Sequence, residues 1–252
     1  KVMTLPDDVI VYPAHGAGSA CGKNMSKETT STIGIQKLMN YALRGNMSEA
    51  EFVKEVTDGL LPPPTYFGAN VAMNKSGYES FETVLNQGMK AYNAKVFEAI
   101  AEETGALILD TRNSSEFYLG HIPQSINIGI QGDFAPWVGA MIGDVKQAII
   151  LVTNIGQEEE TVTRLTRVGF DNIVGHLEGG FDAWKGAGKE FDTVNRITAQ
   201  EFAKQVKIGE SLILDVRKQS EYSAEHIEEA YSRPLAEIND WVKEIDPKQH
   251  FY

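Results

Sequence analysis

The chain has 252 residues, a formal net charge of -12 and a pI near 4.9, and it contains one cysteine, Cys21. A chain this acidic has no basic face to neutralise a phosphate backbone or an anionic bilayer, so we expect neither nucleic-acid nor membrane binding. No apolar run approaches the roughly 20 residues needed to span a bilayer, and a single cysteine excludes an internal disulfide framework and fits a reducing, cytoplasmic location.

The first part of the chain is predicted to contain one short strand followed by helices. Residues 9–12 are apolar and strand-like, and a glycine-rich turn at His15 follows them. A helix is expected over about 32–43, and another begins at the capping-box pair Ser48 and Glu51. Because this region has little β structure or core of its own, we expect it to be the end of a larger domain.

An internal repeat dominates the rest of the chain. The run ALILDTRNSSEFYLGHIPQSINI at 106–128 matches SLILDVRKQSEYSAEHIEEAYSR at 211–233 when it is shifted by 105 positions without a gap. The shift superposes Asp110 on Asp215 and also aligns an arginine, a glutamate and a histidine in the two copies. A step of this length is the size of a small domain and too long for a solenoid unit, so it predicts two tandem domains.

Each copy is predicted to begin with an amphipathic helix that leads to a buried strand. In the second copy, Thr198 and Glu201 have capping-box spacing at the start of that helix. Strands are expected at residues 107–109, 149–152, 173–174 and 212–214. Strands that alternate with helices indicate an α/β fold with a mostly parallel sheet that helices cover on both faces.

Four motifs in the first copy resemble the rhodanese family. They are the strand-end motif Asp110, Arg112 and Glu116; GHIP at 120–123; Ser125–Asn127; and LEGGFDAW at 177–184. The resemblance covers residues 90–193 as one rhodanese-like domain and 194–252 as the first half of a second. In this family a cysteine thiolate at the end of a central strand carries sulfur, in a loop whose N–H groups point inward ahead of a helix.

The family's active loop, Cys-x-x-Gly-x-Arg-Ser, lacks its nucleophile in this chain. Carried over by position, it falls on Thr153, Asn154, Ile155, Gly156, Gln157 and Glu158. The glycine is retained, Thr153 occupies the cysteine position and Glu158 the arginine position. A threonine hydroxyl cannot carry sulfane sulfur, and three glutamates at a helix start would repel anionic substrates. We therefore expect no catalytic residue in this chain and a packing or docking role for the first module.

Other polar residues of the repeats are expected to be structural. Asp110 and Arg112, like their repeats Asp215 and Arg217, fit an ion pair that braces the neighbouring loop better than a substrate-binding pair. The repeated histidines His121 and His226 are expected to brace turns. A third histidine, His176, is expected on the surface or in a loop.

The second copy stops before the position of its active loop. Glu225 and Glu228 replace the glycine and proline of GHIP, which implies a somewhat different turn, and residues 249–252 resemble the entry to the strand that carries the loop. Since the chain starts at Lys1 and ends at Tyr252, we expect a segment of a longer protein. In such a protein, a cysteine a few residues beyond Tyr252 would make the second module the active one.

The leading region resembles the C-terminal end of metallo-β-lactamase-fold proteins of the glyoxalase II and persulfide dioxygenase group. The run VYPAHGAGSACGKNMSKETTSTIGIQKLMNYAL at 11–43 carries the resemblance, with features at 51–53 and 62–67. It implies that residues 1–78 are the mostly helical end of an αββα fold and that 79–89 are a linker. The resemblance places His15 at the metal cleft, as a second-site ligand or a neighbouring cleft residue.

The metal-binding motif His-x-His-x-Asp-His of that fold is absent, and one histidine cannot hold a metal, so this segment alone is expected to bind none. Cys21 is the one thiol that could be reactive, although free cysteines are commonly inert and buried.

These resemblances imply a sulfur-metabolising fusion protein, in which an iron centre oxidises a low-molecular-weight thiol persulfide and a rhodanese module transfers sulfur. One alternative is a glyoxalase II-like thioester hydrolase with two zinc ions. Another is a non-catalytic, partner-binding rhodanese-like module, and homo-oligomer formation is left open. Phosphatase activity is disfavoured because it needs a cysteine in the loop.

Overall fold

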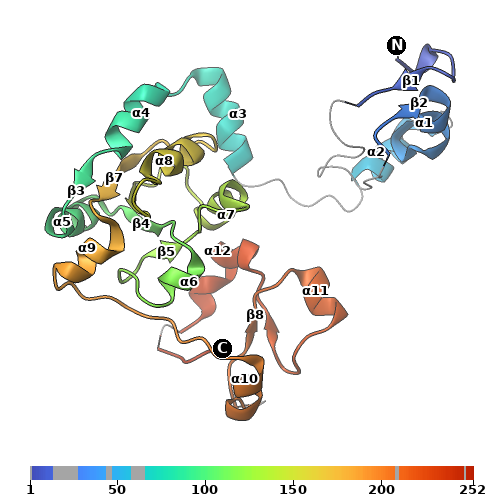
Figure 1. The fold of residues 1–252 in the computed structure, drawn as a ribbon. Coiled ribbons are helices and arrows are strands. Elements are labelled where there is room, and N and C mark those ends of the chain that lie inside the picture. Colours follow the sequence, from blue (N-terminus) through green and yellow to red (C-terminus); the bar gives the residue numbers. More distant parts are fainter. Residues whose placement is uncertain (1, 14–27, 44–46, 58–65, 208–209, 247) are drawn as a thin grey trace. The chain divides into compact units, whose positions relative to one another are not determined.

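A computed structural model describes residues 2–13, 28–43, 47–57, 66–207, 210–246 and 248–252 (Figure 1). The chain divides into two compact units, Lys1–Pro62 and Pro63–Tyr252, and each unit is described by itself. No helix in the described ranges combines the length and the apolar character needed to cross a membrane.

The described residues of the first unit form two paired strands and two helices; the first strand and both helices lie close to the predicted positions, whereas the second strand was not predicted. Strand β1 (Ile10–Val11) pairs antiparallel with β2 (Ser31–Thr32). The helices are α1 (Ile33–Met39) and α2 (Glu49–Thr57), and the 3-10 turns are η1 (Val2–Thr4) and η2 (Tyr41–Leu43). The predicted capping pair forms ahead of α2, since the Ser48 N–H donates to Glu51 Oε2 at 2.7 Å. Among the described residues of this unit, Ile33 is the one fully buried hydrophobic side chain.

The first copy of the repeat forms a first module in the second unit, built on five parallel strands. Their order in the sheet is β3 (Ala91–Tyr92), β7 (Ile173–Leu177), β6 (Ile149–Val152), β4 (Leu107–Asp110) and β5 (Ile126–Asn127). Every pairing is parallel, which confirms the predicted α/β class. All four residues of β6 are buried, because this strand lies in the middle of the sheet and has helices over both faces.

Helices cover the two faces of this sheet and form two separate cores. Ile149 and Leu151 point into one core, and Ile150 and Val152 point into the other, as alternation along a strand requires. Helices α4 (Phe81–Gly88), α7 (Phe134–Met141) and α8 (Glu158–Thr166) contribute to the first core, and α5 (Ala94–Thr104) and α9 (Gly180–Gly186) to the second. Helix α3 (Tyr66–Ser76) precedes α4, and the short α6 (Ser114–Phe117) follows β4 (Figure 1).

Residues 79–89, expected to be a linker, instead contain helix α4, which is part of the first module. Val84 is 4% exposed and lies in the first core. Gly88 approaches α8 so closely that an added Cβ would lie 2.7 Å from Val162 Cγ2. The sequence hid this helix because it has eight residues and few apolar ones, and its start is marked only by Ser80, whose hydroxyl accepts from the Thr83 N–H at 3.2 Å.

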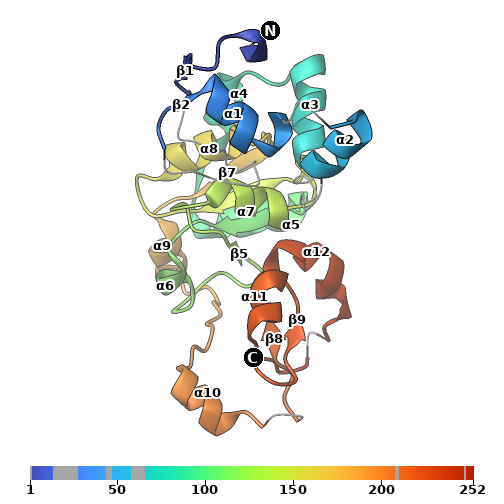
Figure 2. The ribbon, with the colours of Figure 1, turned by 90° about the vertical axis from the view of Figure 1, so that its right-hand side faces the viewer.

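The second module repeats the strand register of the first. Strand β8 (Leu214–Asp215) pairs parallel with β9 (Tyr231–Ser232), and Leu214 faces Tyr231 as Leu109 faces Ile126, 105 positions earlier. Its helices are α10 (Ala199–Gln205), α11 (Gln219–Ala224) and α12 (Ile238–Trp241), with the 3-10 turns η3 (Leu235–Glu237) and η4 (Val242–Glu244) (Figure 2). The predicted capping box of Thr198 and Glu201 starts α10. The repeat is therefore structural as well as sequential.

We predict that Val84→Ala lowers the free energy of unfolding of the first module by about 2 kcal/mol, because two buried methyl groups are lost. Val96→Ala on α5 is the matched control, since Val96 is 41% exposed, and it should change stability by less than about 0.5 kcal/mol. Urea unfolding followed by circular dichroism measures both, and equal effects would contradict the core position of α4.

Candidate functional site

The loop that the resemblance assigns to sulfur transfer connects β6 to α8 at the carboxyl edge of the sheet. It begins at Thr153, directly after the fully buried β6, and ends at Gln157. Gly156 adopts a left-handed φ of +87°, which turns the chain toward the helix at little steric cost. Three glutamates occupy the first turn of α8, where the partial positive charge of the helix start favours carboxylates.

Thr153 is enclosed at the base of this loop. Thr153 is 1% exposed, and its Oγ1 forms no hydrogen bond with any residue the structure describes. Gly180, at the start of α9, packs against the loop so closely that an added Cβ would lie 2.9 Å from the Thr153 carbonyl oxygen. The position of the expected nucleophile thus holds a buried hydroxyl without an acid or base partner.

Carboxylates of the protein itself hold the rest of the loop. Glu158 Oε2 accepts a hydrogen bond from the Gly156 N–H at 2.8 Å. Glu116 Oε2 accepts from Asn154 Nδ2 at 3.2 Å and from the Asn113 N–H at 3.1 Å. In a sulfurtransferase the N–H groups of this loop bind an anionic substrate. In this chain the Glu158 carboxylate is bound to one of these N–H groups, that of Gly156.

A shallow cavity of about 330 Å³ lies beside the loop. Its lining comprises Arg112, Glu116, Leu119, Gly120, Thr153, Asn154, Ile155, Gly179, Gly180, Phe181, Asp182 and Lys185. The apolar side chains at its rim are strongly exposed, with Ile155 at 80% and Leu119 at 65%. The hydrogen bond from Lys185, at 2.9 Å, and the positive charge of Lys185 lower the pKa of Asp182 below the ordinary aspartate value.

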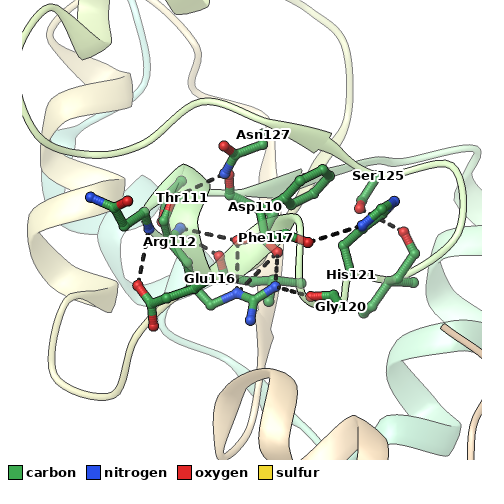
Figure 3. A network of polar contacts seen from close by, with 12 residues as sticks. Asp110, Thr111, Arg112, Glu116, Phe117, Gly120, His121, Ser125 and Asn127 are labelled. Carbon is green, nitrogen blue, oxygen red and sulfur yellow. Dashed lines mark hydrogen bonds and ion pairs between the residues drawn. The ribbon is translucent and has the colours of Figure 1, made fainter. Parts of the chain in front are cut away.

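Asp110 and Arg112 form a buried clamp at the end of β4 (Figure 3). Arg112 Nε lies 3.0 Å from both carboxylate oxygens of Asp110, and Nη2 lies 2.5 Å from Oδ2. The same Nη2 donates to the Gly120 carbonyl at 2.9 Å, and the guanidinium lies 4.3 Å from the centre of the Phe181 ring. The Arg112 side chain is 7% exposed, and its Nε and Nη2 both donate to groups of the protein.

The second copy repeats this clamp in a more exposed setting. Arg217 Nη2 donates to Asp215 Oδ2 at 2.6 Å and to the Glu225 carbonyl at 2.8 Å. The hydrogen bond from Arg217 lowers the pKa of Asp215, and the same bond raises the pKa of Arg217. The side chain of Arg217 is 47% exposed, in contrast to that of Arg112.

The turn after α11 differs from that of the first copy at its start and matches it further on: α6 ends at Phe117, whereas α11 ends at Ala224, two positions beyond the counterpart of Phe117. Gln124 and Glu229, which are 105 positions apart, have positive φ values of 63° and 62°. At this turn the arginine donates to a backbone carbonyl, that of Gly120 in the first copy and that of Glu225 in the second, so the change of side chain leaves the contact intact.

The histidines of the two copies also correspond. His121 Nδ1 lies 3.1 Å from the Phe117 carbonyl and its ring stacks on Phe117, and His226 Nδ1 lies 2.8 Å from the Tyr222 carbonyl with its ring on Tyr222. These contacts hold the turns together. His176, expected on the surface or in a loop, is instead 7% exposed inside β7, because this strand extends to Leu177 between β3 and β6.

Two residues singled out from the sequence, His15 and Cys21, lie outside the residues that the structure describes. Within the described ranges, no three His, Cys, Asp or Glu side chains come close enough together to hold a metal ion.

The sequence did not predict the hydrogen bonds from the loop to Glu116 and Glu158. The spacing of Gly156 and Glu158 was the available signal for one of them, and the other joins segments 38 positions apart.

The chain matches the family described as Rhodanese-like domain over residues 93–187 and 198–252. The adenylyltransferase and sulfurtransferase uba4 of Pyricularia oryzae is 27% identical over an alignment of 111 residues, and the match covers 37% of this chain and 23% of that protein. A solved metallo-β-lactamase from Staphylococcus aureus is 30% identical, covers 69% of this chain and 46% of its own, and gives a TM-score of 0.51. The Alr3790 protein from Anabaena sp. is 26% identical over 42% of this chain and 82% of its own, with a TM-score of 0.36.

The chain spans less than half the length of the Pyricularia and Staphylococcus proteins. The similarity to the Staphylococcus protein covers 69% of the chain, which is more residues than lie outside the two rhodanese matches. The likeness to the Staphylococcus protein therefore includes part of the rhodanese-like region.

We predict that Arg112→Met lowers the free energy of unfolding by about 3–5 kcal/mol, because it leaves the buried Asp110 carboxylate without its partner. Arg217→Met in the second copy should cost no more than about 1 kcal/mol, since the Arg217 side chain is 47% exposed and water screens its charge. Thermal and urea unfolding of the two variants provide the comparison. Similar losses in both would show that burial of the first clamp is not the source of its effect.

Proposed function

We propose that this chain, which belongs to the rhodanese-like family, is part of a sulfur-metabolising fusion enzyme in which the first rhodanese-like module transfers no sulfur. In this proposal a preceding metal-dependent region acts as a persulfide dioxygenase, and the first module serves as a packing or docking element. The whole protein would act on a low-molecular-weight thiol persulfide. The single cysteine of the chain supports a reducing, cytoplasmic setting.

The observation that carries the proposal is the buried Thr153 at the end of β6. Sulfur transfer needs an atom that ionises, attacks a sulfane sulfur and keeps it as a persulfide. A threonine hydroxyl ionises far above neutral pH unless a base takes its proton, and no described residue accepts a hydrogen bond from Thr153 Oγ1. The carboxylate of Glu158 on the Gly156 N–H adds a negative charge where an anionic donor would bind.

The likeness to the Staphylococcus metallo-β-lactamase and the motif around His15 support the metal-dependent part of the proposal. A bound iron ion would supply the oxidation of the persulfide by oxygen in a dioxygenase. Because the described residues contain no complete set of ligands, we derive no step of that reaction from this chain.

A thioester hydrolase with two zinc ions is the second candidate, favoured by the same motif. Metal analysis and activity assays of the full-length protein separate the two candidates. One iron per chain with persulfide-dependent oxygen uptake is the expected result, whereas two zinc ions with thioester hydrolysis would overturn the dioxygenase proposal.

The strand pairing in the second module supports one position for a nucleophilic cysteine in a longer form of the chain. Phe251 forms a parallel bridge with Leu212, as Ile149 pairs with Leu107 in the first module. Thr153 follows Ile149 by four positions, so its counterpart would be the third residue after Tyr252. We propose a cysteine at that position, and the adjoining coding sequence tests it directly.

We predict that the unmodified chain has no thiosulfate:cyanide sulfurtransferase activity and that Thr153→Cys combined with Glu158→Arg gives weak activity at most. The double change supplies a thiol and removes the carboxylate from the loop, but Glu159 and Glu160 still repel the anionic donor. Thr153→Ser with Glu158→Arg is the matched control and should be inactive. Robust turnover by the unmodified chain would contradict the proposal.

A further inference from the structure

A groove of about 870 Å³ lies at the amino ends of the strands of the first module, on the edge of the sheet opposite the loop at Thr153. Its volume falls in the range of about 300–1,000 Å³ that is typical of ligand sites. Residues from the start of β4, from α5 and α9 over one face of the sheet, and from α7 over the other face line it. A site that extends around the end of a strand in this way suits a polypeptide segment better than a compact small molecule.

Within the described ranges, the first two residues of β4 have no strand partner on the side of this groove. Strand β6 pairs with Leu107 to Asp110, whereas β5 pairs only with Leu109 and Asp110. The Leu107 N–H donates to the Ala148 carbonyl on the β6 side at 2.8 Å, so the next N–H, that of Ile108, points to the other side. Among the described residues no strand lies opposite Ile108 there. An open strand edge of this kind can add an extended peptide by main-chain hydrogen bonds.

The floor of the groove is apolar. Ala101, Leu107, Ile108 and Met141 are half-buried in it, and Trp184 lies beneath them with 3% of its surface exposed. Partly exposed aliphatic side chains on both sides of an open strand provide contacts for alternate side chains of an added strand.

The rim of the groove is acidic. Glu98, Glu102, Asp144 and Glu190 line it, and Lys189 is the one basic residue among the lining residues. The Lys189 ammonium is engaged, since it forms an ion pair with Glu98 and lies 5.8 Å from the centre of the Trp184 ring. The groove therefore favours a positively charged partner.

We propose that this groove binds an extended segment of a partner protein in which basic and apolar side chains alternate, and that the segment pairs with β4 at Ile108. A second copy of this chain is a poor occupant, because a net charge of -12 on each copy opposes association. The inference rests on the charge, the apolar floor and the open strand edge, and it is independent of the proposed sulfur chemistry.

The experiment uses the whole 252-residue chain and an acetylated, amidated octapeptide of alternating lysine and leucine. An octapeptide with glutamate in place of lysine is the control probe. We expect calorimetric binding of the lysine peptide only, together with slower hydrogen exchange of the Ile108 amide. Binding of both peptides alike, or unchanged exchange at Ile108, would overturn the proposal.

Charge-reversal variants locate the site. Glu102→Lys with Asp144→Lys should weaken binding of the lysine peptide by at least about tenfold, because like charges then meet at the rim. Glu228→Lys with Glu210→Lys, at exposed positions of the second module, changes the net charge equally and should leave the affinity within about twofold. Equal losses in the two variants would mean a general charge effect and would overturn the proposal, as would self-association of the chain through the groove in sedimentation.

Discussion

The buried ion pair between Asp110 and Arg112 sets the geometry of the first module's carboxyl edge. A fully buried carboxylate is costly without a partner, and Arg112 meets that need with two donor groups on Asp110. The same guanidinium reaches the Gly120 carbonyl and lies over Phe181 of α9. One side chain therefore joins the end of β4, the turn after α6 and the start of α9. The start of α9 also packs on Thr153 through Gly180. The clamp therefore helps to position the loop after β6 through its contact with α9.

The two copies show which parts of this arrangement the fold itself requires. The clamp, the stacked histidine and the residue with positive φ recur at the same step along the chain. The degree of burial differs, since the Arg112 side chain is 7% exposed beneath Phe181 while the Arg217 side chain is 47% exposed. The contacts to backbone carbonyls are thus kept when the side chain changes from Gly120 to Glu225. The contribution of the ion pair to stability depends instead on how far neighbouring side chains bury it.

Sequence patterns predicted the buried elements well and the half-buried ones less well. The limits of β6 match the prediction, because an unbroken apolar run between polar turns leaves few alternatives. The repeat predicted the shared register of β4 and β8. Helix α4 and the burial of His176 were missed, since both depend on packing against segments more than 70 residues away. The position of Thr153 followed from the resemblance, but its enclosure by Gly180 and the contacts of Glu116 needed coordinates.

The Glu158 carboxylate accepts the hydrogen bond of the Gly156 N–H and so occupies this donor of the loop. A carboxylate two residues from the N–H it binds behaves as a tethered ligand, and its effective concentration far exceeds that of any free anion in solution. A thiol introduced at position 153 alone would therefore still leave the Gly156 N–H bonded to the Glu158 carboxylate, so one substitution would not free this N–H for an anionic ligand.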